Sequence, residues 1–76
     1  MKPITDESVD AVYKIFRDHI ETYGWSPSYE EVGGQLNMSA GMVWHRVQIL
    51  IEFGLLTYRT RIYNSPRNLM LRGNQP

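Results

Sequence analysis

Apolar residues between Thr5 and Tyr23 recur every three or four positions, which is the spacing of one face of an α-helix. The stripe consists of Val9, Val12, Tyr13, Phe16, Ile20 and Tyr23. Thr5 or Asp6 is suited to cap the start of this helix, and Gly24 follows its last turn. We therefore expect the chain to begin with an amphipathic helix that buries one face.

A second, shorter helix is predicted to start near Tyr29. Ser28 and Glu31 have the spacing of a capping box, in which each side chain accepts a hydrogen bond from the other residue's backbone amide. Gly33 and Gly34 then weaken the helix, each by about 0.8–1 kcal/mol relative to alanine. The pattern leaves two interpretations of these glycines open, close packing of helices or simple flexibility.

A third helix is predicted over residues 40 to 53, after a turn of about three residues at 37–39. Asn37 is suited to a left-handed turn position, Ser39 to capping the helix, and Gly54 to ending it. Its apolar stripe consists of Val43, Val47, Leu50 and Ile51. Two helices joined this tightly, the second carrying hydrogen-bonding side chains off its apolar stripe, form the helix-turn-helix arrangement.

After Gly54 the apolar period changes to two, which is the period of a β-strand. The first run alternates through Leu56, Tyr58, Thr60 and Ile62, and a second short run spans Leu69 to Arg72. We expect a β-hairpin over 55–72 with a polar, arginine-bearing tip, and a frayed tail at 73–76. The whole chain, 1–76, is thus predicted to be one mainly α domain with a small β-hairpin, a three-helix winged helix-turn-helix.

The distribution of charge changes the interpretation of an overall net charge of zero. A zero net charge by itself disfavours a nucleic-acid partner, because phosphate contacts need cations. Residues 1–38, however, hold three basic and seven acidic residues, whereas residues 39–76 hold five arginines and Glu52 alone. The two halves therefore carry −4 and +4, and a basic second half is typical of a protein that binds a polyanion.

Several function classes are not expected from the sequence. The chain has no cysteine, which excludes a disulfide framework and a cysteine-based zinc site, and we expect neither a metal nor a cofactor. No apolar run approaches the roughly 20 residues that span a bilayer, and the start lacks the pattern of a signal peptide, so we expect a cytoplasmic protein with no membrane contact. The acidic residues of the first helix indicate a solvated face, and no nucleophile motif or phosphate-binding loop is present; we do not expect an enzyme.

The order of these parts resembles the amino-terminal DNA-binding domain of the LexA repressor family, over about residues 4 to 72. The matching segments are Ile15–Ile20, Gly24–Ser28, Glu31-Val32, Leu36, Ser39–Leu50, Gly54–Leu56 and Pro66–Leu69. The resemblance implies a DNA-binding transcription regulator, but the protease domain of LexA repressors is not expected in 76 residues. Bulky Met42 and Trp44 stand at or beside the positions that the family uses for base contacts, so the resemblance implies no operator sequence.

We expect the third helix to lie in the major groove of double-stranded DNA, which admits an α-helix. By position, the candidate contacts are Ser39, Gly41, Met42, Trp44, His45 and Arg46. The Arg46 guanidinium suits guanine O6 and N7, and His45 suits a base or a phosphate. Trp44 is open to two interpretations, contact with a thymine methyl or packing in a core or interface.

Further candidate contacts flank that helix. Arg59, Arg61 and Arg67 of the hairpin are expected along phosphates or in the adjacent minor groove, and the alternative is an ordinary charged hairpin face. Ser28 and Tyr29 are candidates for contact with the DNA backbone, although capping alone explains Ser28 equally well.

A winged-helix module for protein interaction or dimerisation is the alternative function. It is motivated by the zero net charge and by the apolar side chains of Met42, Trp44, Trp25 and Tyr63, which we expect to be exposed. A homodimer or a partner protein is also compatible with DNA binding, because one unit of this size contacts only about half of a typical site.

Overall fold

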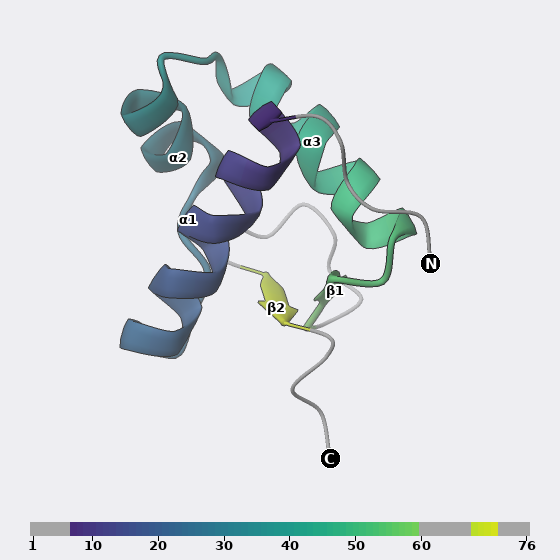
Figure 1. Cartoon of the computed structure of the whole chain (residues 1–76). Coiled ribbons are helices and arrows are strands. Elements are labelled where there is room, and N and C mark those ends of the chain that lie inside the picture. The colour runs from purple at the N-terminus through teal and green to yellow at the C-terminus, as the bar shows by residue number, and fades with distance from the viewer. Residues whose placement is uncertain (1–6, 60–67, 72–76) are drawn as a thin grey trace.

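The computed structural model describes residues 7–59 and 68–71, which form three helices and a two-stranded antiparallel sheet (Figure 1). The elements in chain order are α1 (Glu7–Tyr23), α2 (Tyr29–Leu36), α3 (Ala40–Glu52), β1 (Leu56–Tyr58) and β2 (Leu69–Leu71). The predicted fold class, a mainly α winged helix-turn-helix with a small hairpin, is confirmed. The proposed caps Thr5 and Asp6, the hairpin tip with Arg61, Tyr63 and Arg67, and the tail at 73–76 lie outside the described residues.

The stripe of α1 is buried over most of its length but not at its end. Val9, Val12 and Phe16 are fully buried, whereas Tyr23 is 55% exposed. The last turn of α1 extends beyond α2 and α3, and there Tyr23 stacks on Trp25 with 5.8 Å between the ring centroids (Figure 1). The expectation that the buried stripe continues to Tyr23 is therefore wrong, because no other helix covers this turn.

The predicted helix caps are confirmed. The Ser28 amide donates to the Glu31 carboxylate at 2.8 Å, and the Glu31 amide donates to the Ser28 hydroxyl at 3.1 Å, which completes the capping box of α2. Asn37 ends α2 in the left-handed conformation with φ 59°. The Ser39 hydroxyl accepts from the Met42 amide at 3.2 Å and caps α3. The third helix ends at Glu52, one residue earlier than predicted, with Phe53 as its cap and Gly54 at φ 79°.

The two glycines of α2 have different surroundings. Gly33 is buried against the turn into α3, where the Met38 amide donates to its carbonyl at 2.9 Å. A Cβ added at Gly33 would collide with the Met38 carbonyl oxygen, whereas a Cβ at Gly34 would meet nothing within 4 Å. Close packing is thus the reason for glycine at 33, and no packing reason exists at 34.

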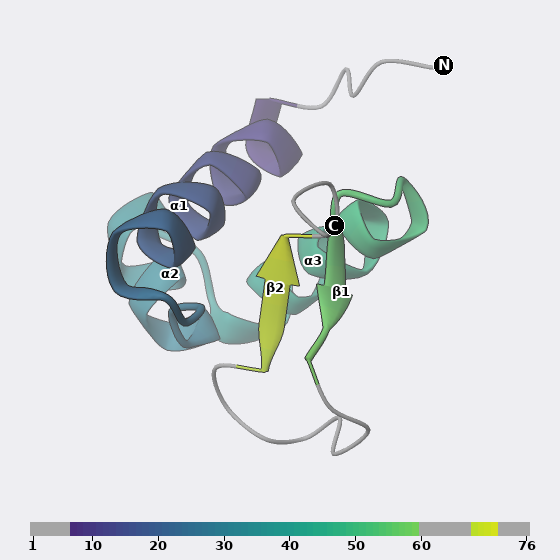
Figure 2. The same ribbon diagram turned by 90° about the horizontal axis from the view of Figure 1, so that it is seen from below.

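The hairpin packs one face against the helices (Figure 2). Leu56 pairs with Leu71 and Tyr58 with Leu69 in an antiparallel register. Leu56, Leu69 and Leu71 are buried, and they join a core built largely from α1 and α3. That core contains Val9, Val12, Phe16, Val32, Val43, Val47, Leu50, Leu56, Leu69 and Leu71. The hairpin, called the wing below, therefore belongs to the same core as the helices.

Removing the helix caps is expected to cost measurable stability. Ser28→Ala and Ser39→Ala should each lower the free energy of unfolding by about 1 kcal/mol, because backbone amides of the first turn lose their acceptor. For a domain of this size that corresponds to a fall in Tm of about 4–8 °C in thermal unfolding followed by circular dichroism. Ser39→Asn, which retains a capping side chain, is the control, and equal Tm values for Ser39→Ala and Ser39→Asn would contradict the assignment.

Candidate nucleic-acid interface

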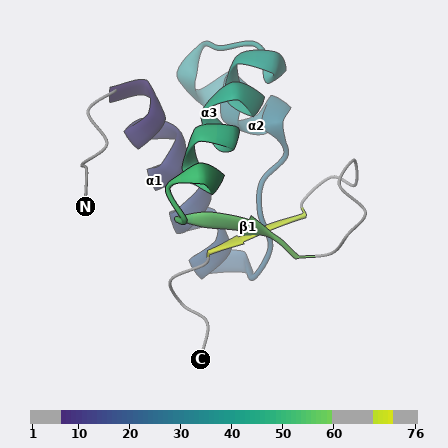
Figure 3. The ribbon, with the colours of Figure 1, turned by 90° about the vertical axis from the view of Figure 1, so that its right-hand side faces the viewer.

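One side of α3 faces the core and the opposite side faces solvent. Val43, Val47 and Leu50 are fully buried. The opposite side, called the exposed flank of α3 below, carries Gly41, Met42, Trp44, His45, Ile49 and Glu52 together with half-buried Gln48. The helix follows α2 after a three-residue turn. Its first turns lie at the surface of the molecule (Figure 3).

Trp44 belongs to the exposed flank and not to the core. Its side chain is 45% exposed, and the ring meets the His45 ring edge to face with 5.4 Å between centroids. Met42 is exposed to a similar extent, 43%. Of the two interpretations of Trp44, core packing within the chain is therefore wrong, and contact with DNA or with another protein remains open.

Arg46 lies at the border between α3 and α1. Its Nε donates to the Ser8 hydroxyl of α1 at 3.1 Å, and its Nη1 donates to the Met42 carbonyl at 3.4 Å. A guanidinium has five N–H donors, so other donors remain for a ligand. The side chain is half-buried and directed toward α1, away from the centre of the exposed flank.

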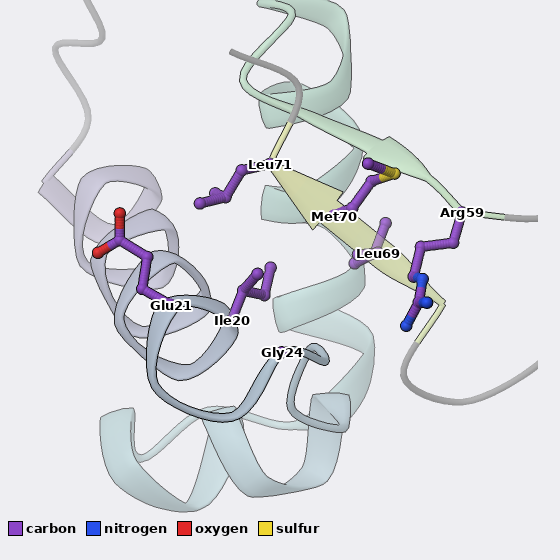
Figure 4. Close-up of a pocket in the computed structure, with 7 residues that line it drawn as sticks. All are labelled: Ile20, Glu21, Gly24, Arg59, Leu69, Met70 and Leu71. Carbon is purple, nitrogen blue, oxygen red and sulfur yellow. The ribbon is translucent and has the colours of Figure 1, made fainter. Parts of the chain in front are cut away.

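Arg59 directly follows β1 and is exposed. Its amide donates to the carbonyl of Asn68, which precedes β2. Arg59 lines a pocket beside the carboxyl end of α1, together with Glu21 and Gly24 (Figure 4).

The structure does not bring Arg46 and Arg59 together. Arg46 donates to Ser8 in the first turn of α1, whereas Arg59 lines a pocket with Ile20, Glu21 and Gly24 at the other end of that helix. Ser8 and Ile20 are twelve positions apart, which is roughly 18 Å along the helix. Arg46 and Arg59, which the sequence predicts to contact the same DNA, therefore lie beside opposite ends of α1, and Arg61 and Arg67 lie outside the described residues.

Gln48 is a candidate site residue that sequence reasoning missed. Its Nε2 donates to the Tyr58 hydroxyl of β1 at 3.1 Å and so connects the exposed flank of α3 to the wing. The signal available in the sequence was its spacing, because residues three and four positions beyond His45 and Trp44 lie on the same side of a helix.

The amino ends of α2 and α3 differ in charge. Glu30 and Glu31 stand in the first turn of α2, whereas the first turn of α3 carries no acid. The partial positive charge of a helix amino end favours phosphate, and carboxylates beside it oppose that attraction. Of these two ends, that of α3, at Ser39, is electrostatically better suited to a phosphate.

Tyr29 is packed between the helices as well as near the surface. Its ring lies 6.4 Å from that of Phe16, centroid to centroid, and burial raises the pKa of its hydroxyl, to which nearby Tyr58 adds a further upward shift. The hydroxyl is therefore protonated at neutral pH and able to donate a hydrogen bond. Ser28 is occupied by the capping box, so the structure gives it a local role without requiring a ligand.

No protein-family model and no curated protein matches the chain. Within the described residues, no helix is both long and apolar enough to cross a membrane. In the same part of the chain, no group of three or more histidine, aspartate or glutamate side chains is arranged to hold a metal ion.

Proposed function

We propose that this chain binds double-stranded DNA as a sequence-selective transcription regulator, with α3 in the major groove and the wing beside it. The observation that carries the proposal is the exposed flank of α3, which follows a tight turn and presents Trp44 and His45 to solvent with half-buried Gln48 beside them. The major groove is about 12 Å wide and accommodates a helix of this kind. The resemblance to LexA repressors supports the same function.

Each residue of the exposed flank suits a different part of the groove. Gly41 has no side chain to hold the helix away from the bases. His45 suits a hydrogen bond to a base edge or phosphate, and Trp44 and Met42 suit contact with a thymine methyl group. For Arg46 we favour a phosphate over guanine, because its Nε already donates to Ser8 of α1 and its Nη1 to the Met42 carbonyl of α3 itself. Contacts of the wing arginines Arg61 and Arg67 remain a prediction.

Binding should weaken steeply with salt, because phosphate contacts release counterions. We expect fluorescence anisotropy with labelled duplexes to give a log Kd that rises linearly with log salt. His45→Ala and Trp44→Ala should each weaken binding to a selected duplex by about 5- to 150-fold, which corresponds to the 1–3 kcal/mol of a good base contact. Thr22→Ala, an exposed change in the last turns of α1, is the matched control. Salt-independent binding, or His45→Ala and Trp44→Ala variants that bind like Thr22→Ala, would refute the proposal.

A protein-interaction module is the second candidate, and the exposed apolar side chains favour it. Met42, Trp44 and Ile49 are exposed on α3, and Tyr23 and Trp25 at the end of α1. Light scattering and chemical-shift mapping distinguish the candidates. Association through Trp44, with duplex DNA leaving its signals unshifted, would favour the interaction module. DNA-dependent shifts over residues 39–48 would favour the regulator, whether it acts alone or as a dimer on two half-sites.

A further inference from the structure

We infer that Gln48 recognises an adenine and that Tyr58 of the wing orients its amide; this inference rests on the proposed DNA binding. The observation is the hydrogen bond from Gln48 Nε2 to the Tyr58 hydroxyl, 3.1 Å long and partly buried. This bond joins the exposed flank of α3 directly to the wing, side chain to side chain. Gln48 thus lies where the helix and the wing would meet the same groove.

The chemistry of the amide explains why this bond selects a base. A glutamine amide has one carbonyl acceptor and two N–H donors. When one N–H is donated to Tyr58, the carbonyl and the other N–H remain for the groove. Adenine presents a complementary pair there, the N6 amino group as donor and N7 as acceptor. Guanine presents acceptors at both N7 and O6, so its O6 would face the glutamine carbonyl oxygen and repel it.

Tyr58 holds the amide in this orientation when its hydroxyl accepts from Gln48 Nε2. It faces α3 from β1, where its backbone is held opposite Leu69, and its side chain is half-buried. The reverse orientation, with the hydroxyl donating to the glutamine carbonyl, would leave both N–H groups for guanine. The hydroxyl of Tyr58 therefore acts as a positioning group, and Gln48 makes the base contact.

A different result is expected if the bond only stabilises the position of the wing. In that case the loss of Gln48 would lower the stability of the protein and weaken its binding to every duplex equally, with no change in base preference. Selectivity at a single base pair therefore separates recognition from bracing. Three variants serve the test: Gln48→Met keeps the length of the side chain without the amide, Tyr58→Phe removes only the hydroxyl, and Thr57→Ser, a neighbouring change on the outer face of β1, is the control.

The experiment begins with selection of preferred duplexes from a random library by the unmodified protein. Dissociation constants are then measured for all four base pairs at each position. The unmodified protein and Thr57→Ser should prefer adenine at one position by about 5- to 100-fold. Gln48→Met should abolish that preference and leave the others intact, and Tyr58→Phe should reduce it and raise the relative affinity for guanine. Circular dichroism establishes that each variant is folded.

A chemical change in the DNA tests the contact without altering the protein. Replacing that adenine by 7-deazaadenine removes the N7 acceptor, so it should weaken binding by the unmodified protein and have no effect on Gln48→Met. Three results would overturn the inference while DNA binding itself still holds. They are equal weakening of binding to all base pairs by Gln48→Met, no effect of 7-deazaadenine, and a preference for guanine at the position. Failure of the unmodified protein to bind any duplex in a salt-dependent manner overturns both.

Discussion

Gly33→Ala is expected to lower the free energy of unfolding by about 1–3 kcal/mol, the usual cost of forcing extra atoms into a packed interior. The added methyl group would collide with the Met38 carbonyl oxygen, which is backbone and not the movable end of a side chain. Relief requires a shift of the turn at 37–39 relative to α2. Because the whole domain is stabilised by only roughly 4–11 kcal/mol, the loss is a large fraction of the total.

Gly34→Ala provides the matched control in the same helix. The added methyl would meet nothing within 4 Å, so this variant should be more stable than the parent by up to about 1 kcal/mol through helix propensity. Urea unfolding of the two variants, with m-values compared, measures the difference. Changes of the same sign and size at both positions would show that the close approach at Gly33 has no energetic importance.

The position of α3 gives the Gly33 substitution a functional consequence. The turn at 37–39 sets where α3 leaves α2, and its Ser39 hydroxyl caps the helix proposed to enter the groove. A shift of this turn would move Trp44 and His45 relative to the wing. We therefore expect Gly33→Ala to weaken duplex binding even at temperatures where the variant is fully folded, and Gly34→Ala to leave it unchanged.

The sequence was sufficient for features that depend on neighbouring residues. The capping box of Ser28 and Glu31, the left-handed Asn37 and the turn after Phe53 at Gly54 are all confirmed. Each of these depends on one side chain bonding a backbone group within a few residues, or on the conformational freedom of a single residue. Such local interactions can be predicted from the order of amino acids. They gave the boundaries of α2 and α3 to within one residue.

Features that depend on residues far apart in the chain were not predictable in the same way. Arg46 reaches Ser8, which is 38 positions away, and Gln48 reaches Tyr58 across the start of the wing. Helical spacing shows that such side chains lie outside the apolar stripe, but it does not show which residue of another element they contact. The same limit applies to Gly33, because its close contact with Met38 appears only when α2 and the turn are folded together.

Ser26 illustrates this limit most clearly, and Ser26→Ala should lower the free energy of unfolding by about 1–3 kcal/mol. In the sequence it is a polar residue of a short link between helices. In the structure it is fully buried, and its hydroxyl accepts from the Leu69 amide of β2 at 3.2 Å. The Arg59 amide donates to the Asn68 carbonyl, so in the alternating antiparallel pattern the next amide, that of Leu69, points away from β1. Without the Ser26 hydroxyl, this buried donor loses its acceptor.

Hydrogen exchange locates the effect of Ser26→Ala. We expect exchange of the Leu69 amide, measured by NMR, to accelerate more than the global loss of stability explains, because the hydroxyl ties the wing to the link between α1 and α2. Ser28→Ala is the matched control, since Ser28 lies in the same link but its hydroxyl accepts from Glu31 in the capping box of α2. If the protection of the Leu69 amide falls equally in both variants, Ser26 does not anchor the wing specifically.

The same substitution should also affect DNA binding. A wing that has lost the bond to Ser26 must become ordered when DNA binds, so Ser26→Ala should raise the Kd for duplex DNA by more than Ser28→Ala does, while the salt dependence stays the same.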